Sequence, residues 1–300
     1  MIKNINEILV NSIRAVNHNL KFVILFWLTN TAFAIVLSVP IYNLLLNDLK
    51  NSLMSDKLSS GFDYFWYLQF RNLYEIPLDQ IPWAIFTVAG IYTIIQTFYL
   101  GGLISVFNQF NKNHYVDFFY GGVKYFFRFF KVLLISIIFY SAAFLINDLI
   151  GDLITMVFRN TEFVKTEFLI RFLRYTLLLF LIGIITLISD YSKVALALKD
   201  KVRVIEEIIY ASKFIQENFS IVFLVFLFIA FLGALGSIVY NLVVIEIPRT
   251  PYYFLIASFI LQQMLIIFRL LIRMLFCSSE VILFKDLAAG VIQTEEKEEL

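Results

Sequence analysis

The sequence predicts an all-α polytopic membrane protein, with six transmembrane helices and amphipathic interfacial helices on the cytoplasmic side. Two observations carry this prediction. Hydrophobic residues make up 60% of the 300 residues and charged residues only 16%, whereas soluble domains hold about 45–50% and about 25% respectively. Several apolar runs also exceed the roughly 18 residues that mark a membrane-spanning helix. Residues 1–300 therefore read as a single membrane domain.

Composition also excludes several classes of site. The net charge of +1 gives no field that would attract nucleic acid. Cys277 is the single cysteine and His18 and His114 the two histidines, so we expect no disulfide, no metal site and no cofactor. No metal-binding, phosphate-cradling or nucleophile-elbow motif is present. We therefore expect no enzyme, and no catalytic residue is assigned.

The first part of the chain pairs an amphipathic segment with a span. Residues 1–21 place apolar side chains at helical spacing opposite polar ones. The first span follows over 22–46, and Pro40 is expected to kink it because proline lacks the N–H group that the helix needs.

A long polar segment, 47–81, separates the first two spans. Its aromatic cluster at 62–70 suits the membrane–water interface, where Trp and Tyr are favoured. Pro82 is expected to open the second span, 82–107, since the first turn of a helix tolerates proline. Gly101 and Gly102 within this span predict a close helix contact or a bend.

The remaining four spans follow from the same apolar runs. After an Asn-rich turn at 108–113 they are expected over 132–150, 168–189, 219–245 and 252–276, with a mixed-charge loop at 151–167 and a tight turn at 248–251. Residues 291–300 form a charge run without an apolar face, which predicts a disordered tail. Six spans put both termini on one side. Fourteen Lys and Arg residues then lie on that side and eight on the other, which favours cytoplasmic termini in the cell membrane.

A charge pattern recurs three times, at 7–21, 117–131 and 206–220, and each copy leads directly into an apolar run. The pattern favours a threefold internal repeat, and shared membrane constraints are the alternative. The proposed repeats are 1–107, 108–198 and 199–290.

In the second copy the bases Lys124, Arg128 and Lys131 share one helical face, because offsets of 4 and 7 residues return to nearly the same angle. One interpretation is that such helices only anchor the spans and set their orientation. The other is that these three bases contact lipid headgroups or a protein partner.

Polar side chains inside the spans are the other candidates, because they are costly in lipid. We expect Asn30, Gln96, Gln262 and Gln263 to form hydrogen bonds between helices. Arg269 and Arg273 share a face of the sixth span, with Asp190 and Glu280 as possible partners. An Asp190–Arg273 ion pair would be either a packing device or part of a polar path for a substrate.

Three stretches carry a resemblance to a known family: GGVKYFFRFFKVLL at 121–134, DYSKVALALKD at 190–200 and ASKFIQENFSIVF at 211–223. Together they resemble the membrane domain of glycerophosphoryl diester phosphodiesterase and related prokaryotic multi-span proteins. In that family a soluble catalytic barrel can be fused to the membrane part. This chain has no counterpart of the barrel or of its metal-binding residues, so the resemblance implies a membrane fold without phosphodiesterase activity.

Two functions from different classes remain. The first is a non-enzymatic scaffold or partner in a membrane or lipid-envelope process, with membrane lipids as its partners. The second is a transporter or channel for a small or lipidic solute, which should place a polar cavity at the middle of the bilayer. A membrane-embedded enzyme ranks third. The sequence leaves the protein partner and the oligomeric state open.

Overall fold

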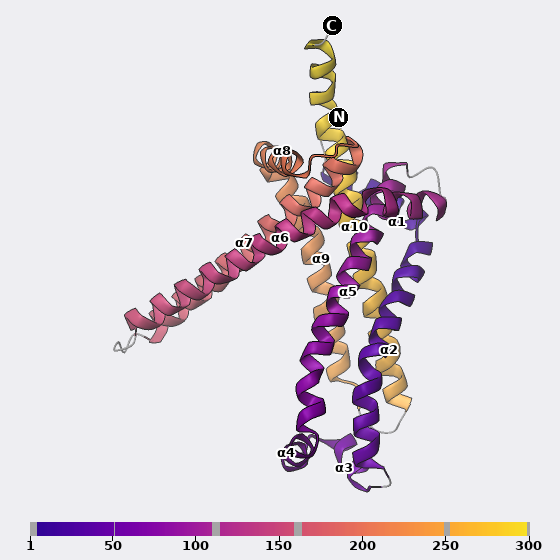
Figure 1. Cartoon of the computed structure of the whole chain (residues 1–300), viewed down its shortest axis with the longest axis vertical. Coiled ribbons are helices and arrows are strands. Elements are labelled where there is room, and N and C mark those ends of the chain that lie inside the picture. The colour runs from indigo at the N-terminus through magenta and orange to yellow at the C-terminus, as the bar shows by residue number, and fades with distance from the viewer. Residues whose placement is uncertain (1–4, 51, 110–114, 159–163, 249–252, 299–300) are drawn as a thin grey trace. The chain divides into compact units, whose positions relative to one another are not determined.

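The computed structural model describes residues 5–50, 52–109, 115–158, 164–248 and 253–298 (Figure 1). Within these ranges the chain is built of helices and contains no strand. The helices are α1 (Ile5–His18), α2 (Lys21–Leu49), α3 (Met54–Ser60), α4 (Tyr64–Leu73), α5 (Glu75–Asn108), α6 (Tyr115–Phe158), α7 (Val164–Leu198), α8 (Val204–Glu217), α9 (Phe219–Ile245) and α10 (Tyr253–Glu298). The expected turns at 108–113 and 248–251 lie in part outside the described residues, as does His114.

Six of these helices are long and apolar enough to cross a membrane: α2, α5, α6, α7, α9 and α10. The shortest, α9, has 27 residues, and about 20 suffice to cross a hydrocarbon core. Their outward faces are apolar, as Phe86 at 72% exposure and Val239 at 58% illustrate. Exposing so much apolar surface to water would be unfavourable and would lead to aggregation, whereas the hydrocarbon of a lipid bilayer can cover it. The chain is therefore a multi-pass, all-α membrane protein, as predicted.

The structure differs from the expected boundaries at Pro82. The second span does not begin there, because α5 starts seven residues earlier at Glu75 and carries Pro82 in its interior. Pro77 takes the place in the first turn instead, where the missing N–H group costs no intrahelical bond. The polar residues at 75–81 are thus helical.

The third span is part of a longer helix than expected. The amphipathic segment 117–131 and the span 132–150 form one uninterrupted helix, α6, which also takes in the first residues of the expected loop at 151–167. The helix α10 extends as far as Glu298, and the disordered tail expected at 291–300 stays a prediction.

The contacts within the chain group it into two compact units, and the single membrane domain expected from the sequence stays a prediction. The first unit comprises Met1–Ser12, Thr97–Leu224 and Cys277–Leu300, and the second comprises Ile13–Gln96 and Val225–Phe276. The first unit therefore holds α6, α7 and α8 whole, and the second holds α2, α3 and α4 whole. These boundaries do not follow the three proposed repeats, which remain a prediction.

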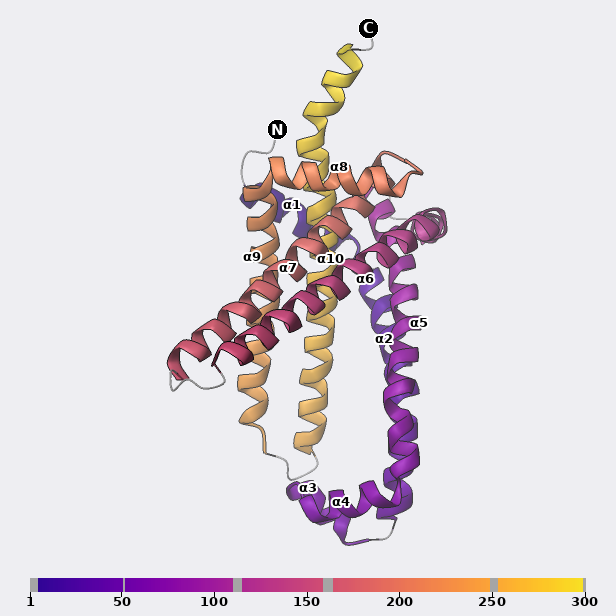
Figure 2. The same ribbon diagram turned by 60° about the vertical axis from the view of Figure 1, so that its left-hand side comes forward.

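In the first unit, α6 and α7 pack along each other, and α8 packs against α7 (Figures 1 and 2). Aromatic rings join α8 to its neighbours. The Phe214 ring on α8 lies 5.6 Å from that of Tyr191 on α7 and 5.0 Å from that of Phe284 on α10. All three side chains are buried, so one face of α8 packs against protein.

In the second unit, α3 and α4 are organised by one carboxylate. Asp63 accepts hydrogen bonds from the backbone N–H groups of Phe65 at 3.0 Å and Trp66 at 3.1 Å, and it pairs with Lys57 at 2.6 Å. This is an N-cap for α4. The Lys57 hydrogen bond is the main reason that the pKa of Asp63 lies below its ordinary value. The expected interfacial aromatic cluster at 62–70 therefore lies mostly on a capped helix.

Glycines set the contact between α5 and α6 in the first unit. A Cβ added at Gly102 would lie 2.6 Å from the carbonyl oxygen of Phe118, and one added at Gly101 would lie 3.1 Å from that of Gly121. The distance at Gly102 is too short for a side chain unless the backbone moves, and the one at Gly101 requires its neighbour to yield by a few tenths of an ångström. The expected close helix contact at Gly101 and Gly102 is confirmed.

We expect Gly102→Ala to lower the unfolding free energy by about 1–3 kcal/mol, because the added methyl group must push α5 and α6 apart. Gly90→Ala on the same helix is the matched control. A Cβ there meets no atom within 4 Å, and alanine favours the helix by up to about 1 kcal/mol. Thermal unfolding in detergent micelles measures both. Equal effects of the two substitutions would show that the contact does not depend on glycine.

Candidate functional site

The bases of the second amphipathic segment lie on α6, but two of them are bound to a carboxylate. Asp200 accepts hydrogen bonds from the Lys124 ammonium at 2.9 Å and from the Arg128 guanidinium at 2.7 Å. Asp200 lies in the short connection between α7 and α8 and has a φ of 50°, a conformation that Asp and Asn tolerate better than most residues. The Tyr125 hydroxyl reinforces the contact by donating to the carbonyl oxygen of Ala197 at 3.2 Å. Together these bonds hold the α7–α8 connection against α6.

The ion pairs act on the titration of Asp200. The hydrogen bond from Lys124, followed by that from Arg128, lowers the pKa of this carboxyl below its ordinary value of 3.8. A carboxyl group whose pKa falls on folding adds stability at pH values above its unfolded pKa and loses it as the pH drops through the folded value. The contact is therefore intact at neutral pH and weakens only in acid below about pH 4. Because the Asp200 side chain is 53% exposed, its net contribution to stability is small.

Lys131 differs from the other two bases. Its side chain is exposed, and within the part of the chain that the structure describes it forms no ion pair. It lines a groove of about 570 Å³ together with Arg203 and Glu206 of the α8 start, which we call the Lys131 groove. Arg203 and Glu206 pair with each other at 2.8 Å. The three predicted bases thus share a helix. Asp200 pairs with Lys124 and Arg128, so of the three only Lys131 is free to pair with a ligand.

The second group of predicted site residues is divided between the units. Asp190, in the first unit, pairs with Lys193 at 2.9 Å, and the buried Glu280 lies within electrostatic range of both. In the second unit Arg273 donates to the side chain of Gln96, and Arg269 donates to the Ser237 hydroxyl at 3.3 Å. The Asp190–Arg273 pair remains a prediction. The spacing of three residues between Asp190 and Lys193 was a signal for the observed pair that sequence reasoning did not use.

Polar side chains of the second unit bond to one another between helices. The indole of Trp27 on α2 donates to Gln263 on α10 at 2.9 Å, and the hydroxyl of Tyr92 on α5 donates to Asn30 on α2 at 2.5 Å. With the bond between Gln96 and Arg273, these contacts confirm the inter-helix role expected for Asn30, Gln96 and Gln263. Gln262 is exposed instead.

The described residues contain no group of three His, Cys, Asp or Glu side chains arranged to hold a metal ion. Comparison of the chain with known protein families, curated proteins and solved structures finds no match. Among the described residues, the Lys131 groove combines an exposed base that forms no ion pair with an open hollow.

The neighbours Gln262 and Gln263 provide a matched test of the inter-helix contacts. We expect Gln263→Leu to lower the unfolding free energy by about 0.6–1.7 kcal/mol, the range for hydrogen bonds between membrane helices, because the Trp27 indole loses its acceptor. Gln262→Leu should be neutral in lipid. Unfolding in mixed micelles measures the difference, and a larger loss for Gln262→Leu would contradict the assignment.

Proposed function

We propose that this protein is a non-enzymatic scaffold or partner in a membrane or lipid-envelope process, and that it binds anionic lipid headgroups at the Lys131 groove. The observation that carries the proposal is the unpaired Lys131 beside an open groove, while Lys124 and Arg128 are held by Asp200. Basic residues near a membrane surface attract anionic lipid by about 1 kcal/mol each. The bound pair has a different role, which is to fix the connection that forms the wall of the groove.

The proposal includes an orientation. The excess of Lys and Arg on the side of the termini supports a cytoplasmic location for both ends and for the groove, in the cell membrane. The cytoplasmic leaflet carries the anionic lipids that the groove would attract. The resemblance to the membrane domain of glycerophosphoryl diester phosphodiesterase is consistent with this role, and it carries no activity over to this chain.

A transporter or channel is the alternative. The polar residues within the spans of the second unit would be its candidate path. They are bonded to one another across helices, as Trp27 is to Gln263 and Tyr92 to Asn30. This pairing supports a structural role for them and favours the scaffold.

The proposal is tested by counting bound lipids with native mass spectrometry, on protein titrated in detergent with phosphatidylglycerol or phosphatidylcholine. We expect wild type to prefer phosphatidylglycerol and Lys131→Gln to weaken its binding about five-fold, the equivalent of one surface base. Lys213→Gln is the control, because it removes the same charge from the exposed face of α8. No preference in wild type, or equal losses in the two variants, would contradict the proposal.

Asp200→Asn changes the charge in the opposite direction, because it removes a negative charge from the first unit. Asparagine tolerates the same backbone conformation but leaves Lys124 and Arg128 without their ionic partner. We expect phosphatidylglycerol to bind more tightly, by up to about five-fold for each base released. A decrease in the same titration would indicate that the Asp200 contacts build the groove more than they occupy the bases.

A further inference from the structure

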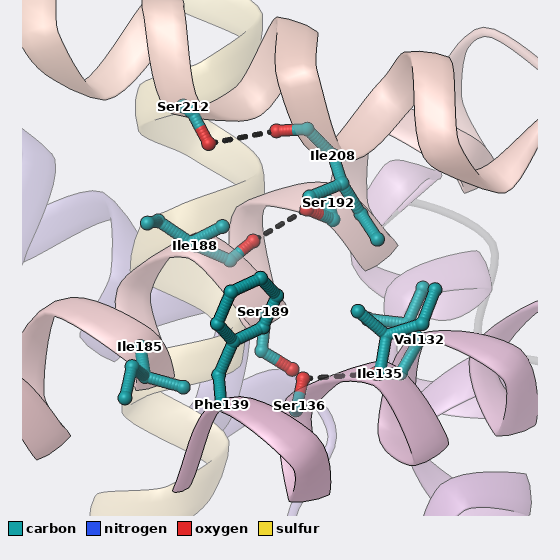
Figure 3. A pocket seen from close by; sticks show the side chains of 10 residues that line it. All are labelled: Val132, Ile135, Ser136, Phe139, Ile185, Ile188, Ser189, Ser192, Ile208 and Ser212. Carbon is teal, nitrogen blue, oxygen red and sulfur yellow. Dashed lines mark hydrogen bonds between the residues drawn. The ribbon is translucent and has the colours of Figure 1, made fainter. Parts of the chain in front are cut away.

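A cavity of about 240 Å³ lies between α6, α7 and α8 in the first unit (Figure 3). We call it the inter-helix cavity. Its walls are largely branched apolar side chains: Ile135 comes from α6, Ile185 and Ile188 from α7, and Ile208 from α8. An apolar cavity of about 150 Å³ already accommodates benzene. The inter-helix cavity is therefore large enough for part of a hydrocarbon chain.

Four serines also line this cavity, and the hydroxyl groups of three of them are already hydrogen-bonded within their own helices. Each donates its hydroxyl to the carbonyl oxygen four residues earlier in its own helix, at 2.9 Å for Ser136, 2.5 Å for Ser192 and 2.9 Å for Ser212 (Figure 3). A buried water needs two to four polar partners, and hydroxyls whose protons are already donated are poor ones. The cavity thus favours hydrocarbon over water.

The inter-helix cavity adjoins the Lys131 groove, because Ile135 lines both. The groove carries two bases, Lys131 and Arg203, and one acid, Glu206, so its side chains sum to a single positive charge. The two hollows therefore meet at the Ile135 side chain, with the bases on one side of it and the apolar lining on the other. A phosphodiester headgroup attached to an acyl chain has the complementary arrangement.

We propose that this site holds one anionic glycerophospholipid, with its phosphate at Lys131 and Arg203 and one acyl chain in the inter-helix cavity. The inference rests on the proposed headgroup contact and specifies its ligand. Each methylene group that is buried multiplies the binding constant by about three to four. A buried acyl chain therefore distinguishes a specifically bound lipid from a diffuse attraction to the membrane surface. A partner helix is excluded as the occupant, because an α-helix is about 10–12 Å across and the cavity has room for a single chain.

The direct test uses wild-type protein and a phosphatidylglycerol that carries a photoreactive diazirine within one acyl chain. After irradiation, the modified residues are mapped by peptide mass spectrometry. We expect adducts on cavity residues such as Ile188 and Ile208. Adducts confined to the outward-facing Ile137 and Ile138, which are 48% and 68% exposed, would overturn the inference.

Filling the cavity provides the second test. Ser136→Phe on α6 and Ser189→Phe on α7 each place a ring in the cavity, and we expect each to reduce retained phosphatidylglycerol at least about tenfold, the equivalent of roughly two methylenes excluded. Ile137→Phe is the matched control, because it adds the same ring on the exposed side of α6. Only variants that remain helical and monodisperse are compared, and if neither does, the adduct map decides.

The outcomes separate this inference from the proposed function. If Lys131→Gln weakens phosphatidylglycerol binding while the filled-cavity variants match Ile137→Phe, the headgroup contact stands and the acyl-chain site is overturned. If wild type holds phosphatidylcholine as well as phosphatidylglycerol, the anionic headgroup contact fails, and the proposed function and this inference fall together.

Discussion

Hydrocarbon offers no hydrogen-bond partner to a polar group, and the rest of this structure depends on that constraint. Within each long helix the backbone satisfies its own N–H and C=O groups, which is why a membrane span is helical. Several polar side chains in the spans find partners in other helices, as Trp27 does in Gln263 and Asn30 in Tyr92. The serines follow the same rule locally, since Ser136 and Ser212 donate to their own helix. The energy of each bond is modest, but an unpaired group in lipid would cost more.

The first unit is held together by close backbone contacts and by ion pairs. Gly101 lets the α5 backbone lie against the α6 backbone at Gly121 and Gly122, and close approach of this kind replaces the hydrophobic driving force that lipid removes. Asp200 then fixes the α7–α8 connection to α6 through Lys124 and Arg128. These contacts leave a cavity beneath α8 and an unpaired base beside it. The lipid site that we propose follows from the way this layer is held together.

Much of the fold could be predicted from the sequence. Apolar length alone located the six spans, because crossing a bilayer is mainly a matter of length and hydrophobicity. The span at 219–245 coincides with α9. Helix ends could not be located in this way, as Pro82 and the uninterrupted α6 show, because polar residues at the membrane surface are compatible with either helix or loop. The inter-helix roles of Asn30, Gln96 and Gln263 followed from the cost of burying an amide in lipid.

The candidate site was only half predictable. The alignment of Lys124, Arg128 and Lys131 follows from helical geometry. The capture of two of them by Asp200 does not, because 72 residues separate Arg128 from Asp200 and no local spacing connects them. The inter-helix cavity also depends on how three helices pack, and no residue in its lining is unusual by itself. Long-range packing decided which base remained available.

The proposed lipid site requires six membrane crossings, with the Lys131 groove on the cytoplasmic side. Single cysteines can test this in a Cys277→Ala background, introduced as Lys57→Cys, Lys201→Cys or Glu246→Cys and treated in intact cells with a membrane-impermeant maleimide. The account predicts labelling at positions 57 and 246, and labelling at position 201 only after the membrane is permeabilised. Labelling of position 201 in intact cells, or protection of 57 or 246, would contradict it.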